Sequence, residues 1–478
     1  MLCALALLGA CTSFNDLAGI SEDLKPSSKP VTVDNLPAGR FEGIGRDQHP
    51  RILATYGGAY SDAKLERMLA GIVGRLTTVS DNPGQTYRIT ILNSPSINAF
   101  ALPGGYLYIT RGLIALANDS AELAAVIAHE MAHVTANHGI LRQKKEKEAE
   151  LANRVVQLVL SDKEEGRKAL IRGKLRLAQF SRNQELQADA IGISAMGEAG
   201  FDAYAAARFQ ESMSSYTAFR SISGASDPSL DFLATHPSTP QRVTLALGHA
   251  RKFGGKGSGV AERDRYLAGI DGMIYGDSAE EGFVRANRFS HPGLGITFAA
   301  PAGFEIENRP EAVIATDSSG VAIRFDGVDI KPGTSLTAYI ASGWVQGLRT
   351  ETIRATTVNG LEAATALASA GEWDFDITVI RYKGRVYRLL TAAPRGSGKL
   401  SMAAQAARNS FRELTPQERA ALRPLHVRIV TASADDTVEK LAARMTGATR
   451  LVDLFRVLNA LGPNDTVQPG QKVKIIAE

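Results

Sequence analysis

The sequence predicts an α+β protein of several domains: a mainly helical domain with a small sheet, then an α/β sandwich, then a small βααβ module. Three observations predict this class. A chain of 478 residues has room for about two to four domains. Residues 41–253 are expected to be mostly helical with a small sheet, whereas strand-like alternation dominates residues 285–415. The glycine-rich stretch of residues 254–259 separates the two and is typical of a flexible break.

The helical domain is expected to begin with a helix followed by a small sheet. Apolar residues recur at helical spacing from Ser61 to Leu76, and polar and apolar residues alternate from Tyr87 to Leu92. The alternating segment predicts a strand that pairs with residues 107–110. The stretch beginning at Asn98 ends in Pro103-Gly104-Gly105, a composition typical of a hairpin turn.

A further helix is expected to begin after Asp119. The Asp119 side chain is a suitable N-cap, and Glu122 lies three residues later, where a capping box places its carboxylate. Apolar residues then follow at helical spacing. Gly139 is the expected end of this helix, because glycine readily adopts the left-handed conformation that ends many helices.

This helix carries the most informative motif of the chain, His129-Glu130-Met131-Ala132-His133. Residues four apart share one face of a helix, about 6 Å apart, so both imidazoles can reach one metal ion. Glu130 lies where a general base could take a proton from water at the metal. The motif therefore predicts a site for one zinc ion. The alternative, a solvated helix with two chance histidines, disagrees with its apolar surroundings, where unpaired polar groups are costly.

A catalytic zinc site needs a third protein ligand. One zinc-peptidase pattern supplies a histidine at position 139, but that residue is Gly139, and His138 is one residue short. His138 is instead expected to pack or to cap the helix end, where a cation is favoured. A later helical segment offers Glu185 and Asp189, which share a face at i and i+4. Glu185 can ligate the metal while Asp189 accepts a hydrogen bond from a ligand imidazole. The alternative is a solvated carboxylate pair.

Four motifs follow one another over residues 50–250, at residues 98–110, 129–133, 182–189 and 235–242. In this order they resemble the zinc metallopeptidase family of the CAAX prenyl protease and the HtpX heat-shock protease, and most closely its soluble periplasmic branch. The resemblance implies a zincin of the gluzincin type. It implies that His129, His133 and Glu185 bind the zinc and that Glu130 is the base.

The same resemblance gives roles to a late motif and to an edge strand. His236 is expected either to stabilise the oxyanion or to cap the metal in a resting state, and the alternative is an ordinary loop histidine. Arg242 carries over as a residue supporting the ligands. Asn98, Ala99 and Phe100 belong to the edge strand, which would hold an extended substrate by backbone hydrogen bonds.

The N-terminal residues predict where the protein is located in the cell. Residues 2–10 are apolar, and Leu8-Gly9-Ala10-Cys11 matches a bacterial lipobox, in which the cysteine is lipidated. The stretch is too short to span a bilayer. We therefore expect a periplasmic protein anchored by Cys11, with Thr12 favouring the outer membrane of a Gram-negative bacterium. The alternatives are a signal peptide cleaved elsewhere or a cytosolic protein with an apolar start.

Two further domains are expected after the glycine-rich break. The first has strands at residues 321–325, 377–382 and 385–390, a hairpin at Gly384, and helices at residues 335–346 and 400–411. With the motifs at residues 289–292, 301–304 and 358–361 it resembles the sandwich of PsbP and Mog-type proteins. The tail has strands at residues 427–430 and 473–476 around helices at residues 436–445 and 451–461. It resembles a LysM module, which commonly holds glycans such as peptidoglycan. Asp435 stands where that pattern has glycine, so a purely structural tail remains an equal alternative.

The composition excludes little beyond nucleic acid as a partner. The net charge is only +4, and no long basic run or basic patch with interleaved aromatic residues occurs. The expected organisation is a signal peptide (1–11), a tether (12–40), a metallopeptidase domain (41–253), a linker with a short helix over residues 261–275 (254–284), a sandwich (285–415) and a LysM-like module (426–478).

The sequence thus predicts a zinc-dependent endopeptidase with one Zn²⁺ per chain. The family resemblance and the predicted location in the cell envelope imply that its substrates are misfolded or stalled envelope proteins, as in protein quality control. The alternative is an envelope scaffold, chaperone or peptidoglycan-binding protein with a quiescent metal site.

Overall fold

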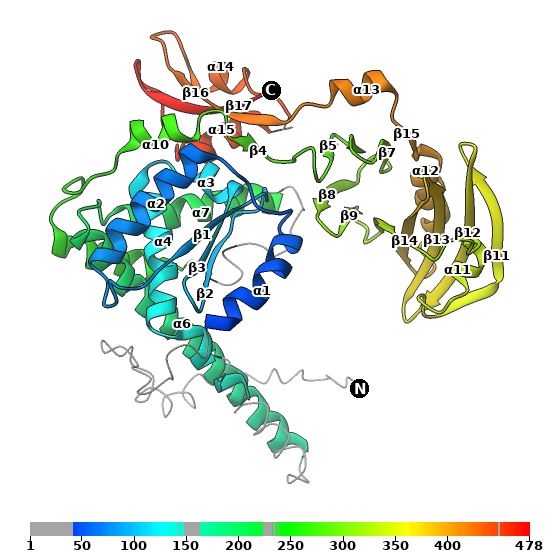
Figure 1. Ribbon diagram of the computed structural model, residues 1–478, viewed down its shortest axis with the longest axis horizontal. Helices are drawn as coiled ribbons and strands as arrows, with labels where there is room; N and C mark the ends of the chain where they lie inside the picture. Colours follow the sequence, from blue (N-terminus) through cyan, green and yellow to red (C-terminus); the bar gives the residue numbers. More distant parts are fainter. Residues whose placement is uncertain are drawn as a thin grey trace, which may run out of the picture.

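Figure 1 shows the computed structural model, in which helices and sheets together form an α+β protein of several parts. The structure describes residues 42–142, 144–147, 163–222, 232, 236–237, 239–447 and 450–478. The expected signal peptide, the lipidation site Cys11 and the tether lie outside the described residues. Within the described part of the chain, no helix combines the length and apolar character needed to cross a membrane.

The helical domain is built around a three-stranded sheet. Its helices are α1 (Glu42–Thr55), α2 (Ala63–Thr78), α3 (Arg111–Leu116), α4 (Ser120–Thr135), α6 (Lys163–Glu198), α7 (Ala205–Ile222), α9 (Pro240–Ala250), η3 (Arg251–Phe253) and α10 (Arg263–Ile270). The strands β1 (Arg88–Leu92), β2 (Ala99–Leu102) and β3 (Tyr106–Thr110) lie in the order β1-β3-β2. The predicted pairing of β1 with β3 is confirmed and is parallel, and β2 is the antiparallel edge strand.

Helix α4, which carries the histidine motif, is almost entirely buried. The predicted N-cap is confirmed, because the Asp119 carboxylate accepts a hydrogen bond from the Glu122 backbone N–H at 2.8 Å. The Glu122 carboxylate reaches the N–H of Asn118 at 2.9 Å, one residue before the position that a capping box requires. The predicted end at Gly139 is wrong. The helix ends before Asn137, which has a φ of 54°, because asparagine also tolerates the left-handed conformation.

Helix α6 approaches α4 closely at Gly192. A Cβ atom at this position would lie 3.0 Å from the backbone nitrogen of His129, so a larger residue would crowd the backbone of α4. Close packing of the two backbones turns the face of α6 that carries Glu185 and Asp189 toward the histidines of α4. A contact between residues far apart in sequence therefore sets up the site.

The sandwich combines a seven-stranded and a four-stranded sheet. The larger contains, in spatial order, β11 (Leu348–Val358), β12 (Leu361–Ala370), β13 (Trp373–Tyr382), β14 (Arg385–Pro394), β10 (Ala322–Val328), β9 (Ala312–Thr316) and β8 (Glu305–Arg309). The smaller contains β15 (Arg412–Glu413), β7 (Ile296–Ala299), β6 (Arg288–His291) and β5 (Phe283–Arg285). The hairpin predicted at Gly384 joins β13 to β14.

Two helices accompany these sheets, α11 (Leu336–Ile340) and α12 (Leu400–Ser410). Helix α12 agrees with the prediction for residues 400–411. Helix α11 is shorter than the predicted 335–346, because Gly343 has a φ of 92°, which does not continue a right-handed helix. The strands predicted at residues 321–325, 377–382 and 385–390 are found within β10, β13 and β14.

The tail forms the predicted strand-helix-helix-strand unit and packs directly on the helical domain. Its elements are β16 (Leu425–Thr431), α14 (Val438–Ala442), α15 (Leu451–Leu458) and β17 (Lys472–Ala477). Strand β16 pairs with β17 on one side and with β4 (Ile274–Tyr275) on the other. In Figure 1 the tail lies against the helical domain. The apolar side chains of the two belong to one continuous core. Helix α13 (Pro416–Ala421) leads from the sandwich into the tail.

The segment expected as a linker contributes to that core. The buried side chains of α10 pack there, and α10 is shorter than the predicted 261–275 because β4 begins at Ile274. A fully buried lysine of the tail, Lys474, also crosses to the helical domain. Its Nζ donates to the backbone oxygens of Ala115, Leu116 and Ala117 at 2.9, 3.0 and 2.8 Å, at the end of α3. The tail is therefore held by both apolar packing and buried polar contacts.

Candidate metal centre and active site

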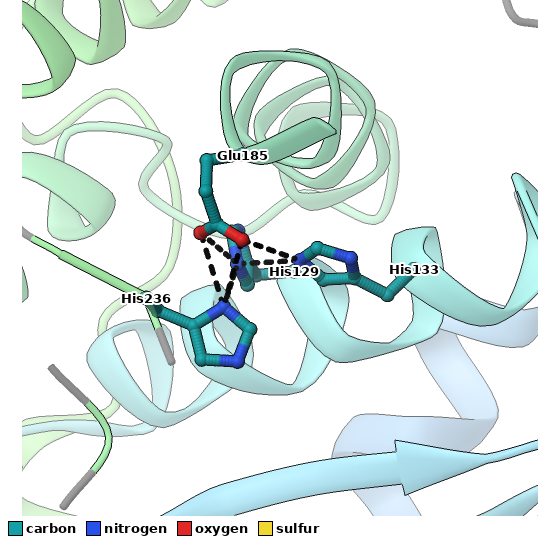
Figure 2. Close-up of side chains that lie close together, drawn as sticks. All are labelled: His129, His133, Glu185 and His236. Atoms are coloured by element: carbon teal, nitrogen blue, oxygen red, sulfur yellow. Dashed lines mark hydrogen bonds and ion pairs between the residues drawn. The ribbon is translucent and has the colours of Figure 1, made fainter. Parts of the chain in front are cut away.

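Four side chains from three separate parts of the chain point toward one another (Figure 2). His129 and His133 project from one face of α4, Glu185 comes from α6, and His236 lies between α7 and α9. One nitrogen or oxygen atom from each of the four lies within 4.8 Å of the other three. Three of the four residues are buried, and His133 is partly buried.

The distances between these atoms fit a tetrahedral zinc ion. His129 Nε2 lies 3.0 Å from His133 Nε2 and 3.1 Å from His236 Nδ1. Glu185 places its oxygens 3.3 Å from His129 Nε2, 3.4 Å from His133 Nε2 and 3.0 Å from His236 Nδ1. Ligands about 2.0–2.1 Å from a tetrahedral zinc are roughly 3.3 Å from one another. Imidazole nitrogens and a carboxylate are also the donors that zinc prefers, so the residues present fit the ion.

Glu130 stands beside this ligand set without joining it. Its side chain is buried, and Oε1 has no hydrogen-bond partner among the described residues; His236 Nε2 is 3.5 Å away. A hydrogen bond from the backbone N–H of Ala101, in strand β2, reaches the carboxylate. Burial outweighs this bond and raises the pKa of Glu130 above its usual range. Within the described residues, a buried carboxylate oxygen without a hydrogen bond therefore lies beside the ligand set.

Asp189 and Arg242 support the ligands from behind. The Asp189 carboxylate accepts from His129 Nδ1 at 3.0 Å, which leaves Nε2 facing the other ligands. Arg242 donates two hydrogen bonds to the same carboxylate, from Nε at 2.7 Å and from Nη2 at 2.8 Å. Its Nη1 atom forms an ion pair with Glu185 at 3.2 Å. Thr239 is the N-cap of α9, and its hydroxyl accepts a hydrogen bond from the backbone N–H of Arg242. This cap fixes the backbone position of Arg242 in the first turn of the helix.

The electrostatics of the cluster follow from these contacts. Burial by itself would lower the pKa of His129, but hydrogen bonds to Asp189 and Glu185 outweigh burial and raise it to about 10. Burial would likewise raise the pKa of both carboxylates, and their hydrogen-bonded partners hold it below the usual range instead. For His133, burial and the nearby charge of His129 hold the pKa well below 6.5. The two carboxylates are therefore ionised and attract a cation.

Strand β2 runs beside α4 at the edge of the small sheet, but its predicted substrate residues point mostly inward. Asn98 is buried and its amide donates to the Tyr56 hydroxyl at 3.0 Å. Ala99 is buried, and the Phe100 ring stacks on Tyr108 with centroids 4.9 Å apart. Any contact that this strand makes with a substrate must therefore rely on its backbone.

His138 was expected to pack or to cap the end of α4. It is buried with its Nδ1 atom 2.9 Å from that of His133, which agrees with packing. Gln187 on α6 also belongs to the surroundings of the site, because its side chain contacts His138. Gln187 was not predicted from the sequence. The one signal for it was its place on α6 between Glu185 and Asp189.

The fold and the site together define a zinc metallopeptidase domain. Residues 62–249 match the model of peptidase family M48. The chain is 26% identical over 243 residues to the beta-barrel assembly-enhancing protease of Escherichia coli, across 49% of this chain and 48% of that protein. It is 28% identical over 212 residues to the mitochondrial metalloendopeptidase OMA1 of Schizosaccharomyces pombe, across 42% of this chain and 58% of that protein.

The chain spans only about half the length of these curated relatives. Among solved structures, cyanobacterial PsbP from Synechocystis aligns with 29% of this chain and 98% of its own, at 15% identity and a TM-score of 0.22. A likeness of that size carries no weight for function. The zinc-peptidase resemblance is thus confirmed for the helical domain, whereas the likenesses of the sandwich to PsbP and of the tail to LysM remain predictions.

Proposed function

We propose that this chain is a zinc-dependent endopeptidase of the bacterial cell envelope. The observation that carries the proposal is the convergence of His129, His133 and Glu185 beside the buried, unpartnered carboxylate oxygen of Glu130. When bound, zinc would act as a Lewis acid and bring the pKa of a coordinated water toward about 7. Glu130 would accept a proton from that water and return it to the leaving amine of the peptide. The raised pKa of Glu130 suits a group that both accepts and donates a proton.

His236 has a proposed role in the resting enzyme. Its Nδ1 atom lies among the ligand atoms, 3.1 Å from His129 Nε2, and three protein ligands are what a catalytic zinc site normally uses. We infer that His236 occupies the fourth position at rest and yields it to substrate. His236→Ala should then retain zinc and raise the rate of peptide hydrolysis. A fall of roughly 10²–10³-fold with zinc retained would instead assign His236 to oxyanion stabilisation.

The substrate is proposed to be an extended segment of an unfolded protein. Strand β2 lies at a sheet edge, and Ala101 connects it directly to Glu130. An edge strand binds a peptide through backbone hydrogen bonds and selects little by sequence. The name of the Escherichia coli relative, a beta-barrel assembly-enhancing protease, favours envelope proteins that are misfolded or stalled in assembly as substrates.

The proposed location is the periplasmic side of a membrane, with Cys11 as the anchor. A lipobox cysteine carries several acyl chains, which is enough for stable anchoring where a single chain is marginal. Cys11→Ser should move the protein from the membrane fraction to the soluble periplasmic fraction. Wild-type protein without an acyl-cysteine mass would contradict the proposed anchor.

A second candidate function is an envelope scaffold or peptidoglycan-binding protein with a quiescent metal site. The observation that favours it is the four-residue ligand set, because sites closed by four protein ligands are typical of structural zinc. The LysM-like tail would supply the contact with the cell wall. Sedimentation of the purified protein with peptidoglycan would test that contact separately from hydrolysis.

Hydrolysis of an unfolded protein separates the two functions. Purified full-length chain would be incubated with casein or an unfolded outer-membrane protein, with and without a zinc chelator, and its zinc content measured. The peptidase proposal expects about one zinc per chain, cleavage that the chelator stops, and recovery when zinc is returned. Stoichiometric zinc without cleavage, for wild type and His236→Ala alike, would favour the scaffold.

A further inference from the structure

The two zinc-binding histidines of α4 are held by different kinds of partner. His129 donates from Nδ1 to the Asp189 carboxylate at 3.0 Å, a pairing common among zinc-bound histidines. His133 has no carboxylate at its Nδ1 atom among the residues that the structure describes. That atom instead lies 2.9 Å from Nδ1 of His138, which is itself buried. A second histidine therefore occupies the place that an acidic residue takes behind His129.

This contact between two imidazoles restricts where the protons lie. A hydrogen bond joining two Nδ1 atoms contains one proton, so one ring donates and the other accepts. A neutral His133 that binds zinc through Nε2 must keep its proton on Nδ1. His133 is then the donor and His138 the acceptor, which requires the proton of His138 to be on Nε2.

Gln187 meets this requirement. The amide oxygen Oε1 of Gln187 lies 3.1 Å from Nε2 of His138 and accepts the proton that this tautomer carries there. The opposite arrangement, with the amide nitrogen donating to His138, would send the His138 proton toward His133. It would place a proton on His133 Nε2, where the zinc must bind.

Helix α6 also fixes the His138 backbone. Gln184 donates from Nε2 to the backbone oxygen of His138 at 2.9 Å. The helix that supplies the ligand Glu185 therefore also supplies both contacts that hold His138 in place. A chain of hydrogen bonds runs from Gln187 through His138 to His133 and ends at the metal position.

We propose that His138 and Gln187 are positioning residues that hold His133 in the tautomer presenting Nε2 to the zinc. This inference rests on the zinc site of the proposed function and adds to it the origin of the orientation of one ligand. It assigns His138 no contact with substrate or metal. Loss of such supporting partners typically weakens metal binding by about 10–100-fold.

The test compares three variants of the full-length protein for zinc affinity, by competition with a chelator. His138→Phe keeps a ring but removes the acceptor, and zinc binding should weaken by roughly 10–100-fold. His138→Asn restores an acceptor oxygen near the former Nδ1 and should remain within a few-fold of wild type. Gln187→Met keeps the length of the side chain but removes the amide oxygen, and should weaken binding by less than His138→Phe. The matched control is His426→Phe, at a partly buried histidine in the tail, and should bind zinc like wild type.

Two further measurements separate positioning from simple structural support. The melting temperature of each zinc-free variant should stay near that of zinc-free wild type. The visible absorption bands of the cobalt-substituted protein should shift in His138→Phe and recover in His138→Asn, because they report the geometry of the ligands. If His138→Phe does not fold, Gln187→Met provides the same comparison.

Equal zinc affinity in wild type, His138→Phe and Gln187→Met would overturn this inference and leave the peptidase proposal standing. A loss of affinity in His138→Asn as large as in His138→Phe, together with lower melting temperatures of the zinc-free proteins, would overturn it in favour of a structural role. Wild-type protein that binds no zinc would refute the proposed function itself.

Discussion

The helical domain with its tail and the sandwich differ in what they bury. Within the described residues, the first region buries many charged side chains: Arg111, Asp119, Glu122, Glu130, Glu185, Asp189, Asp202, Arg242 and Lys474. The described part of the sandwich buries one, Asp326, and Arg388 satisfies it through two nitrogens at 2.6 and 2.8 Å. Burying charge is costly, so a region that retains so much of it does so for function or for specificity. The contrast places the chemistry of the chain in the helical region.

The two regions also differ in how the chain enters them. The chain leaves the helical region after β4 and returns at β16, and these two strands are antiparallel neighbours with Tyr275 opposite Leu425. Paired residues of antiparallel strands lie about 5 Å apart. We infer that the sandwich is inserted into a connection that a short hairpin loop could otherwise make. The tail, although it comes last in the sequence, shares the core of the helical domain.

The largest effect is expected where the buried charge is catalytic. Glu130→Gln should keep zinc, since Glu130 is outside the ligand set, and lower kcat/KM by roughly 10²–10⁴-fold because the general base is lost. The matched change in the other region, Asp326→Asn, should leave kcat/KM within about twofold while destabilising the sandwich. Casein hydrolysis and zinc content measure both. A large loss of activity in Asp326→Asn would remove the functional contrast between the regions.

Metal removal should lower the melting temperature of the helical domain with its tail and leave that of the sandwich unchanged. Glu185→Ala should lose stoichiometric zinc, because fewer than three strong ligands remain beside the replaceable His236. In calorimetry of wild type, a chelator should lower the transition of the helical domain and tail, since a ligand that binds only the folded state stabilises it. The transition of the sandwich should stay in place. One transition that shifts as a whole would mean that the regions unfold together.

Two deletions test the inferred insertion. Replacing residues 277–423 by Asn-Gly, a sequence suited to a tight hairpin, should give a soluble protein that still binds zinc. Removing residues 425–478 should leave the helical domain insoluble or molten, because the core shared with the tail would be exposed to water. Solubility, near-ultraviolet circular dichroism and zinc content report the outcome. A well-folded protein without the tail would show that the tail only rests on the domain.

The smallest effect concerns one contact between the tail and the helical domain. Lys474→Met removes the donor shared by three buried backbone oxygens at the end of α3, of which, among the described residues, only that of Leu116 keeps another donor, Asn118 Nδ2. The change should lower the free energy of unfolding by about 2–4 kcal/mol. Lys472→Met, two residues earlier on the same strand, removes a largely exposed ion pair with Asp264 and should change stability by less than about 1 kcal/mol. Urea denaturation measures both values. Equal values would mean that the buried lysine adds nothing to the attachment of the tail.

Much of the fold follows from local patterns. The spacing of apolar residues predicted α2 and α4, alternation predicted β1, β10, β13 and β14, and the histidine spacing predicted that His129 and His133 share a face. Boundaries were less accurate, because more than one residue type tolerates the left-handed conformation that ends a helix. Asn137 ends α4 where Gly139 was expected, and α11 stops before Gly343, which lies inside the range predicted as helix.

By itself, the sequence determined what depends on neighbours three or four residues apart: the metal helix, its cap and the position of Glu130 beside the first histidine. Only the tertiary structure decided which distant residues meet. It brings Nδ1 of His236 among the ligand atoms, places His138 and Gln187 behind His133, and merges the tail with the helical core. The physical reason is that these contacts depend on how α4, α6 and β16 pack. Packing depends on how much apolar surface all the elements bury together. The spacing of residues within one element does not contain that information.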